Sequence, residues 1–178
     1  MPTWSSSGVP SLHELYLDDC PEMEFLPQGS MPSSLQRLSI IGCSKLIESC
    51  RDWDLHELLS LKEFKTGGKL EGHIESFPKK EGLLLPNLQS LSFLCCTNLK
   101  RINHRGILNL HSLTSSSCFF ACPSMSFEGM PEDGLPPSLS HLTIGCGCRL
   151  LEERCEKEER PDWPKIAHIP HVHVYMDE

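Results

Sequence analysis

The sequence lacks any apolar stretch long enough to cross a membrane. Its longest apolar run lies near Leu83 to Leu85, whereas a membrane helix needs about 20 apolar residues. The amino terminus, which begins Met1-Pro2-Thr3-Trp4, has neither the basic segment nor the apolar segment of a signal peptide. We therefore expect a soluble intracellular protein, cytoplasmic or nuclear, with no membrane partner.

An excess of positive charge is also missing. Among 178 residues there are 16 Lys and Arg against 24 Asp and Glu, which gives a net charge of −8. Because nucleic acids and anionic membranes are bound by clusters of Lys and Arg, this balance argues against both partners. Hydrophobic residues make up 39% of the chain, enough for a folded domain, and 12 Gly with 14 Pro exclude a bundle of long helices.

One apolar pattern recurs along the chain. It has apolar residues at a first position, at +3 and at +5, cysteine at +8 and an apolar residue at +11. The first positions of its copies are Leu12, Leu35, Leu61, Leu88, Thr114 and Leu139, spaced by 23 to 27 residues. In the degenerate fifth copy we assign the pattern to Thr114, Ser117, Phe119, Cys122 and Met125. A second pattern of Pro and Gly, as in Pro131 to Leu139, lies between several copies, which makes chance similarity a poor explanation.

The recurring pattern predicts a solenoid. Apolar residues at +3 and +5 alternate as in a strand with one buried face, and a cysteine at +8 is small enough to sit in a tight turn and donate a weak hydrogen bond. Pro and Gly prevent the return segments from forming long helices. Neighbouring copies must stack to bury their apolar faces, so we expect an α/β-class leucine-rich-repeat solenoid of about six repeats, with parallel strands on the concave face and irregular returns.

Residues 150–160 predict a helix that caps the solenoid. Opposite charges four residues apart support this helix, and Pro161 would end it. Leu151 and Cys155 would share one face and cover the last repeat. Alternation around Val172 and Val174 predicts a short final strand, and the alternative is a disordered charged tail. The expected limits are 1–10 for a short polar segment, 11–149 for the repeats and 150–178 for the capping helix and tail.

These motifs resemble a known family. The form Leu-x-x-Leu-x-Leu-x-x-Cys-x-x-Leu, with returns such as Pro131 to Leu139, is similar to the leucine-rich-repeat region of plant intracellular nucleotide-binding immune receptors. The segments Leu150 to Glu159 and Asp162 to His171 are very similar to the closing segment of the coiled-coil subclass of these NB-LRR disease resistance proteins. The resemblance covers residues 11 to 172.

The resemblance implies a role in plant innate immunity, as the recognition or autoinhibition module of a receptor in the defense response. Its partner would be a pathogen effector, a guarded host protein or the receptor's own nucleotide-binding domain. ADP or ATP would belong to that domain, because its phosphate loop, Gly-x-x-x-x-Gly-Lys-Ser/Thr, does not occur in this sequence. We therefore expect no cofactor in this chain, which would be a carboxyl-terminal fragment or a truncated product. The alternative is a generic leucine-rich-repeat adaptor or a ubiquitin-ligase substrate-recognition protein.

Metal sites and catalysis are the less favoured interpretations. Cys118 and Cys122 have the spacing of one zinc knuckle, but no second pair stands at finger spacing. The cysteine position of the repeat instead accounts for Cys20, Cys43, Cys96 and Cys122. No Gly-x-Ser-x-Gly signature is present. We expect no metal site and no enzymatic activity, with a hydrolase or metal enzyme as the third alternative.

The surface expected to bind a partner follows from the alternation of the strands. With +3 and +5 buried, the positions +2, +4 and +6 point outward. These positions hold Glu14, Tyr16, Asp18, Arg37, Ser39, Ile41, Glu63, Lys65, Ser90, Ser92, Leu94, His141 and Thr143. Tyr16 and Arg37 are residue types that often dominate interfaces, and Ile41 and Leu94 are expected to form an exposed apolar stripe. Phe120 joins this surface if the fifth copy keeps its assigned register.

Overall fold

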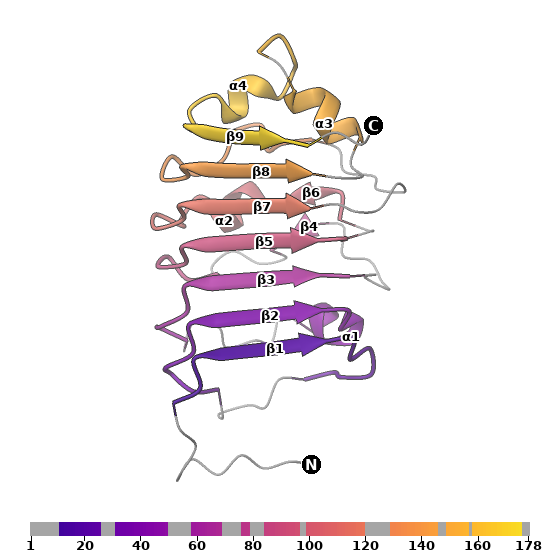
Figure 1. The fold of residues 1–178 in the computed structure, drawn as a ribbon, viewed down its shortest axis with the longest axis vertical. Coiled ribbons are helices and arrows are strands. Elements are labelled where there is room, and N and C mark those ends of the chain that lie inside the picture. Colours follow the sequence, from indigo (N-terminus) through magenta and orange to yellow (C-terminus); the bar gives the residue numbers. More distant parts are fainter. Residues whose placement is uncertain are drawn as a thin grey trace.

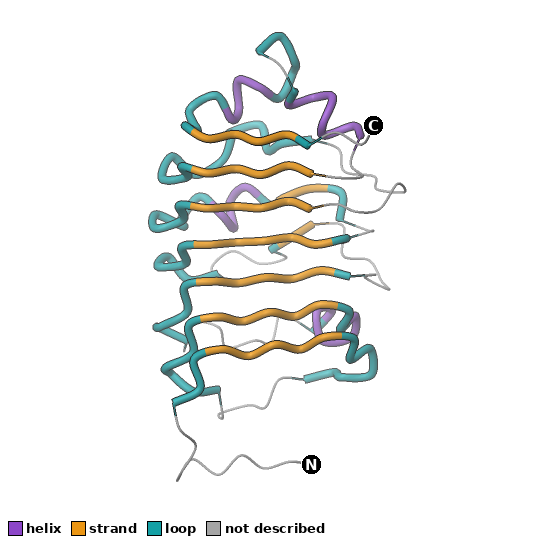
Figure 2. Tube along the Cα trace, in the orientation of Figure 1, coloured by secondary structure: helices purple, strands orange, loops and turns teal. Residues whose placement is uncertain are grey.

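Parallel strands stack one beside another along the chain (Figures 1 and 2). The computed structural model describes residues 11–25, 31–49, 58–68, 76–78, 84–96, 99–119, 129–145, 149–156 and 158–175. The main sheet contains, in this order, β1 (Glu14–Asp18), β2 (Arg37–Ile41), β3 (Glu63–Gly67), β5 (Ser90–Leu94), β7 (Ser115–Phe119), β8 (His141–Gly145) and β9 (His171–Val174). Every neighbouring pair is parallel. The described chain is therefore a parallel-strand β-solenoid, as the sequence predicts.

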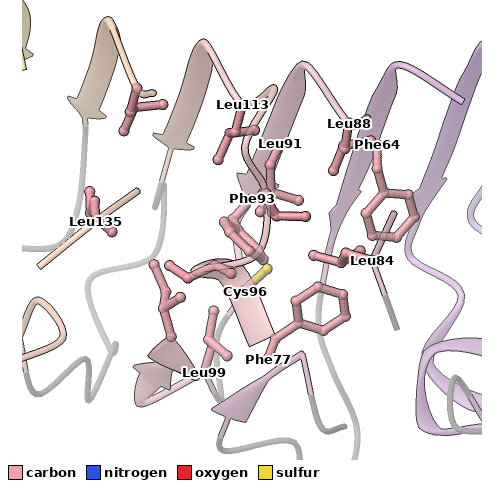
Figure 3. Packing of buried hydrophobic residues seen from close by; sticks show 14 of the residues in the cluster. Phe64, Phe77, Leu84, Leu88, Leu91, Phe93, Cys96, Leu99, Leu113 and Leu135 are labelled. Carbon is pink, nitrogen blue, oxygen red and sulfur yellow. The ribbon is translucent and has the colours of Figure 1, made fainter. Parts of the chain in front are cut away.

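Two columns of inward strand positions run through the solenoid, and the buried apolar residues among them form its core. One column contains Leu15, Leu38, Phe64, Leu91, Ser116, Leu142 and Val172, and the other Leu17, Ile40, Thr66, Phe93, Cys118, Ile144 and Val174. Leu91 and Phe93 are at most 2% exposed and pack with side chains of the return segment such as Leu99 (Figure 3). Leu15 and Leu17 are only partly buried, because β1 has a described strand on one side alone.

The fifth copy has a different frame from the one predicted. β7 pairs Ser116 with Leu91 and Cys118 with Phe93, so the inward positions of this strand are one residue earlier than we assigned. Ser116 is buried at 8% exposure. The prediction was wrong because this copy has a serine at its first inward position, and Phe119 offered a more apolar anchor in the neighbouring frame.

A recurrent backbone hydrogen bond marks the first position in five copies of the pattern. The amide of the first residue donates to the carbonyl oxygen three residues earlier, over 2.9 to 3.1 Å, in the pairs Leu35–Pro32, Leu61–Leu58, Leu88–Leu85, Leu113–Leu110 and Leu139–Pro136. The fifth copy therefore begins at Leu113 and not at Thr114. In these five copies the residue three before the first position is Leu or Pro. Leu110 meets this condition for a first position at Leu113, whereas Thr114 would have His111 there.

The repeat cysteines occupy the turns that follow the strands. The thiol of Cys43 donates to the carbonyl oxygen of Ile41 at 3.3 Å. The thiol of Cys96 lies 3.7 Å from the carbonyl oxygen of Leu94. Cys20 makes the same contact with the carbonyl of its own turn at 3.4 Å. The predicted role of these cysteines as small turn residues with a weak donor is confirmed at these positions.

The return segments contain more regular structure than predicted. They hold α1 (Ser44–Glu48), α2 (His104–Ile107), and a second parallel sheet of β4 (Ser76–Phe77) and β6 (Arg101–Ile102). Phe77 stacks with Phe64, with ring centroids 6.0 Å apart, and meets Phe93 edge-on at 5.6 Å (Figure 3). The second sheet thus closes the core behind β3 and β5. None of the helices in the described ranges is long and apolar enough to cross a membrane.

The carboxyl-terminal segment forms two short helices and the last strand. α3 (Arg149–Cys155) ends well before Pro161, so the helix predicted for residues 150–160 is too long. The chain turns back after α3, and the amide of Asp162 donates to the carbonyl of Arg154 at 3.1 Å. α4 (Trp163–Ile166) then follows, which the sequence analysis missed. The final strand predicted around Val172 is present as β9, paired with β8.

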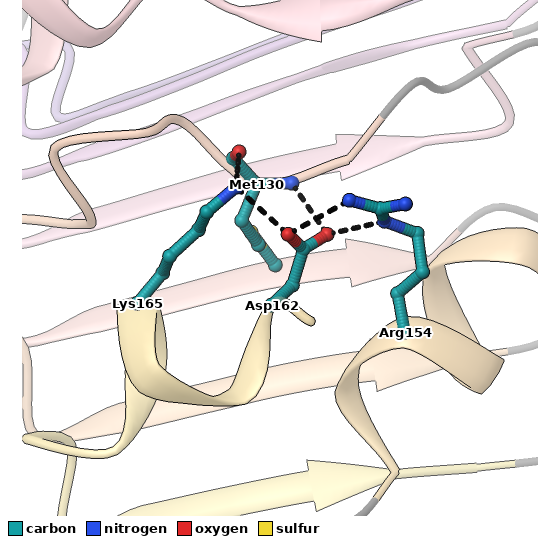
Figure 4. Close-up of polar contacts among 4 residues, drawn as sticks. All are labelled: Met130, Arg154, Asp162 and Lys165. Carbon is teal, nitrogen blue, oxygen red and sulfur yellow. Dashed lines mark hydrogen bonds and ion pairs between the residues drawn. The ribbon is translucent and has the colours of Figure 1, made fainter. Parts of the chain in front are cut away.

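Asp162 fastens this segment to the return side of the sheet (Figure 4). Its carboxylate is fully buried and accepts hydrogen bonds from Arg154 Nε at 2.7 Å and from the Met130 amide at 3.1 Å. Lys165 Nζ lies 2.8 Å from the other carboxylate oxygen and donates to the Met130 carbonyl at 3.0 Å. Burial by itself would raise the pKa of Asp162, but the hydrogen bonds from Arg154, Lys165 and the Met130 amide outweigh it and hold the pKa below its ordinary value.

Candidate protein-binding surface

The outward positions of the main sheet form three columns across the strands. The first contains Glu14, Arg37, Glu63, Ser90, Ser115, His141 and His171; the second Tyr16, Ser39, Lys65, Ser92, Ser117, Thr143 and His173; the third Asp18, Ile41, Gly67, Leu94, Phe119 and Gly145. Every residue predicted for the surface lies in one of these columns. The register of parallel strands therefore brings all of them onto one continuous face.

Charged side chains of β1 to β3 pair with one another at one end of this face. Arg37 forms an ion pair with Glu14 and lies 3.3 Å from a carboxylate oxygen of Glu63. The Tyr16 hydroxyl donates to Glu14 at 2.7 Å, while the Tyr16 side chain stays 61% exposed. The guanidinium of Arg37 is thus held in place by two carboxylates, and the Tyr16 ring stands beside it as an aromatic contact of fixed position.

Several of the predicted residues are less exposed than expected. Ser39 is buried at 6% exposure although it lies in an outward column, because a serine is short and its neighbours in the column are Tyr16 and Lys65. Ile41 and Leu94 are partly buried, and Gly67 lies between them in the column. The expected exposed apolar stripe is therefore wrong; these two side chains are half-covered and separated by a glycine.

Seven positions of these columns were not among the predicted residues. Ser115, Ser117 and Phe119 were lost through the wrong frame of the fifth copy. His171 and His173 were assigned to the tail although they belong to β9, and Gly67 and Gly145 have no side chain to contribute. The alternation of His171 and His173 with Val172 and Val174 was the available signal. Phe120, which the assigned register would have added, lies outside the described residues.

The other end of the face carries histidines, with no acidic residue at the described outward positions around them. His141 on β8 and His171 on β9 are directly paired in the register, and their rings stack with centroids 4.6 Å apart. His173 and Tyr175 are also exposed. Among the described outward positions of β5, β7, β8 and β9 there is no Asp or Glu.

The described residues offer little to a metal ion. No three His, Cys, Asp or Glu side chains in the described ranges lie close enough together to hold one. Cys122 of the candidate zinc knuckle lies outside the described residues. Cys43 and Cys96 are buried free thiols, and burial raises the pKa of Cys43, which disfavours the thiolate that a metal would bind.

These features define a parallel-strand repeat protein whose exposed sheet face is available for contact. The chain is 35% identical to a disease resistance protein of Arabidopsis thaliana, and the match covers 93% of this chain. The matched region is 13% of the length of that relative. No protein-family model matches the chain, and no solved structure matches it. The chain is therefore related to a plant disease resistance protein.

Proposed function

We propose that this chain is a leucine-rich-repeat protein-interaction module that acts in plant defense, as part of an intracellular immune receptor. Its outward sheet face would contact a pathogen effector, a guarded host protein or the receptor's own nucleotide-binding domain. It would act by binding and not by catalysis, in the cytoplasm or nucleus. The observation that carries the proposal is the continuous outward face of seven parallel strands, combined with the similarity to a disease resistance protein.

The charged residues of the face support a role in protein binding, and not in catalysis. Arg37 is neutralised by Glu14 and Glu63, so it is a positioned contact and not an unpaired cation. Tyr16 is exposed beside it, and Tyr and Arg side chains in fixed conformations lose little entropy when a partner covers them. In this proposal, α3, α4 and β9 form the cap of the solenoid, because Leu151 and Ile166 are fully buried under the last strands.

A double substitution tests the position of the site. Tyr16→Ala with Arg37→Ala should abolish recognition by the receptor that carries this chain, or association of the chain with the nucleotide-binding domain. The melting temperature should stay unchanged, because both side chains are exposed and surface pairs contribute little stability. Glu132→Ala on the exposed return side is the matched control. Undiminished binding by the double variant, with loss in the Glu132 variant, would move the site off the strands.

A nucleotide titration tests the assignment of cofactors. We propose that ADP and ATP bind the nucleotide-binding domain of such a receptor and not this chain. Labelled ADP with Mg²⁺ should show no saturable binding to the 178-residue chain, because the phosphate loop and its lysine are missing. A micromolar dissociation constant would contradict this assignment. The second candidate is a ubiquitin-ligase substrate-recognition protein on the same scaffold, which copurification with ligase subunits would favour.

A further inference from the structure

The histidine end of the outward face differs chemically from the rest of the molecule. The chain carries 24 Asp and Glu against 16 Lys and Arg, yet the described outward positions of four adjacent strands, β5 to β9, contain no carboxylate. Apart from Leu94, Phe119 and Gly145 in the third column, these positions hold residues with hydroxyl groups or imidazoles. The nearest charged outward residues are Glu63 and Lys65 on β3, three strands from β8, or about 14 Å at the usual strand spacing.

Hydrogen bonds hold the ring of His141 in one position. Ser140 Oγ lies 2.9 Å from the carbonyl oxygen of Thr114 and 2.9 Å from His141 Nδ1. Because Nδ1 is engaged by Ser140, Nε2 is the ring nitrogen that remains for an acceptor on a partner. An imidazolium ring carries a proton on both nitrogens, so it can donate from Nε2 to such an acceptor and keep the contact with Ser140.

The second ring lies in register with the first. His171 stacks on His141 with an angle of 28° between the ring planes. Two imidazolium rings this close repel each other unless an anion lies against both. A carboxylate is flat and has two oxygens, so it can accept one hydrogen bond from each ring.

We propose that the face formed by His141, His171, His173 and Tyr175, here called the histidine face, binds an acidic segment of a partner protein, and that binding takes up protons. The inference rests on the proposed function, since it names the chemistry of the partner for that surface. Ser115 of β7 and Thr143 of β8 flank the face and supply further neutral donors. α3 and α4 pack on the opposite side of the sheet. There Asp162, which precedes α4, pairs with Arg154 of α3 and Lys165 of α4, and α3 also carries Glu152 and Glu153.

The direction of the pH dependence follows from histidine chemistry. Histidine is the side chain whose charge changes between pH 5 and 8. A carboxylate stays ionised across that range. The acidic segment is therefore bound more tightly by the protonated rings, and by linkage its affinity rises as the pH falls.

The test uses the full chain and a peptide probe. Hexaglutamate labelled with tetramethylrhodamine is titrated with the chain at pH 6.0 and pH 7.5, at low salt, and binding is followed by fluorescence anisotropy. We expect binding at pH 6.0 about fivefold or more tighter than at pH 7.5, and none for a labelled hexaglutamine peptide. The double variant His141→Gln with His171→Gln should lose this pH dependence. His111→Gln, an exposed histidine before β7, is the matched control and should retain it.

Several results would overturn the proposal. They are equal affinity at the two pH values, equal binding of hexaglutamine, or wild-type behaviour of the double variant with an unchanged melting temperature. If the peptide fails to bind while the Tyr16 and Arg37 substitutions still abolish recognition, the proposed function stands and the partner docks at the β1 to β3 end. If those substitutions have no effect while the peptide binds, the histidine face remains and the location of the proposed site changes.

Discussion

Gly42 and Gly68 meet at the carboxyl ends of β2 and β3, where a Cβ atom on Gly68 would lie 2.5 Å from the backbone nitrogen of Gly42. Both have positive φ, +66° and +97°. The same left-handed conformation recurs at Asp19 and Cys95, so each of these turns needs one residue of positive φ to leave its strand. Glycine adopts this conformation without strain, whereas other residues pay for it.

This turn predicts opposite effects for two substitutions. Gly68→Ala should destabilise the chain by about 2 kcal/mol or more, because the new Cβ meets backbone atoms and alanine disfavours positive φ. Cys95→Gly, at the equivalent position one repeat later, should be neutral or stabilise by about 1 kcal/mol. Urea denaturation of both variants measures the difference. A stabilised Gly68→Ala variant would contradict the shared turn geometry.

The inward column predicts a large contrast between neighbouring residues. Leu91 is 2% exposed in the core, so Leu91→Ala should cost about 2–5 kcal/mol. Ser92 lies on the outward face, and Ser92→Ala should change stability by no more than about 0.5 kcal/mol. Thermal melts followed by circular dichroism would show the contrast, and equal melting temperatures would refute the strand register.

A polar residue in the same core predicts a stabilising substitution. Thr66 is 3% exposed, lies in the column between Ile40 and Phe93, and its hydroxyl has no hydrogen-bond partner. Thr66→Val keeps the shape and removes the buried hydroxyl, so it should raise the free energy of unfolding by about 1–2 kcal/mol. Thr143→Val, on the outward face, serves as the control and should have little effect. Loss of stability in the Thr66 variant would show that the hydroxyl is satisfied in solution.

The buried carboxylate predicts a pH-dependent loss. Asp162→Asn should cost about 3 kcal/mol at pH 7, toward the lower end for a broken buried ion pair, because Arg154 and Lys165 keep partial contact with water. The pKa of Asp162 is lowered in the folded state, so its contribution is complete above the unfolded pKa of about 4 and is lost as the pH falls through the folded value. The stability difference between wild type and Asp162→Asn should therefore be constant from pH 5 to 8 and shrink below about pH 4. Glu159→Gln, an exposed change, is the control, and a difference that persists to pH 2 would contradict the ion-pair assignment.

The strand register could be predicted from sequence wherever both inward positions carry strong apolar signals. Leu38 with Ile40 and Leu91 with Phe93 admit one frame only, because a shift by one residue would expose both. The fifth copy fails this condition, since Ser116 is an inward residue without apolar character. In that copy the frame follows from the hydrogen bond between the Leu113 amide and the Leu110 carbonyl, and the apolar pattern alone does not reveal this bond.

The carboxyl-terminal segment could be predicted only in part. Leu151 and Cys155 were assigned to one buried face, and both are fully buried. α4 was missed because it is four residues long and Pro164 stands within it, although Pro near a helix start is itself a signal. The partners of Asp162 come from α3, α4 and the distant Met130, and no local pattern encodes such a convergence. The histidine pair was missed for the same reason, since His141 and His171 are neighbours only after β8 and β9 pair.

The reactivity of the cysteines can be used to measure local opening of the solenoid. The turn residues Cys43 and Cys96 are buried, as is Cys155 of α3, whereas Cys20, which follows the edge strand β1, and Cys95 are partly exposed. A thiol reagent can modify a buried cysteine only after the structure around it has opened. The order in which these positions react under native conditions would thus trace how far unravelling spreads from the β1 edge toward the carboxyl-terminal helices, one repeat at a time.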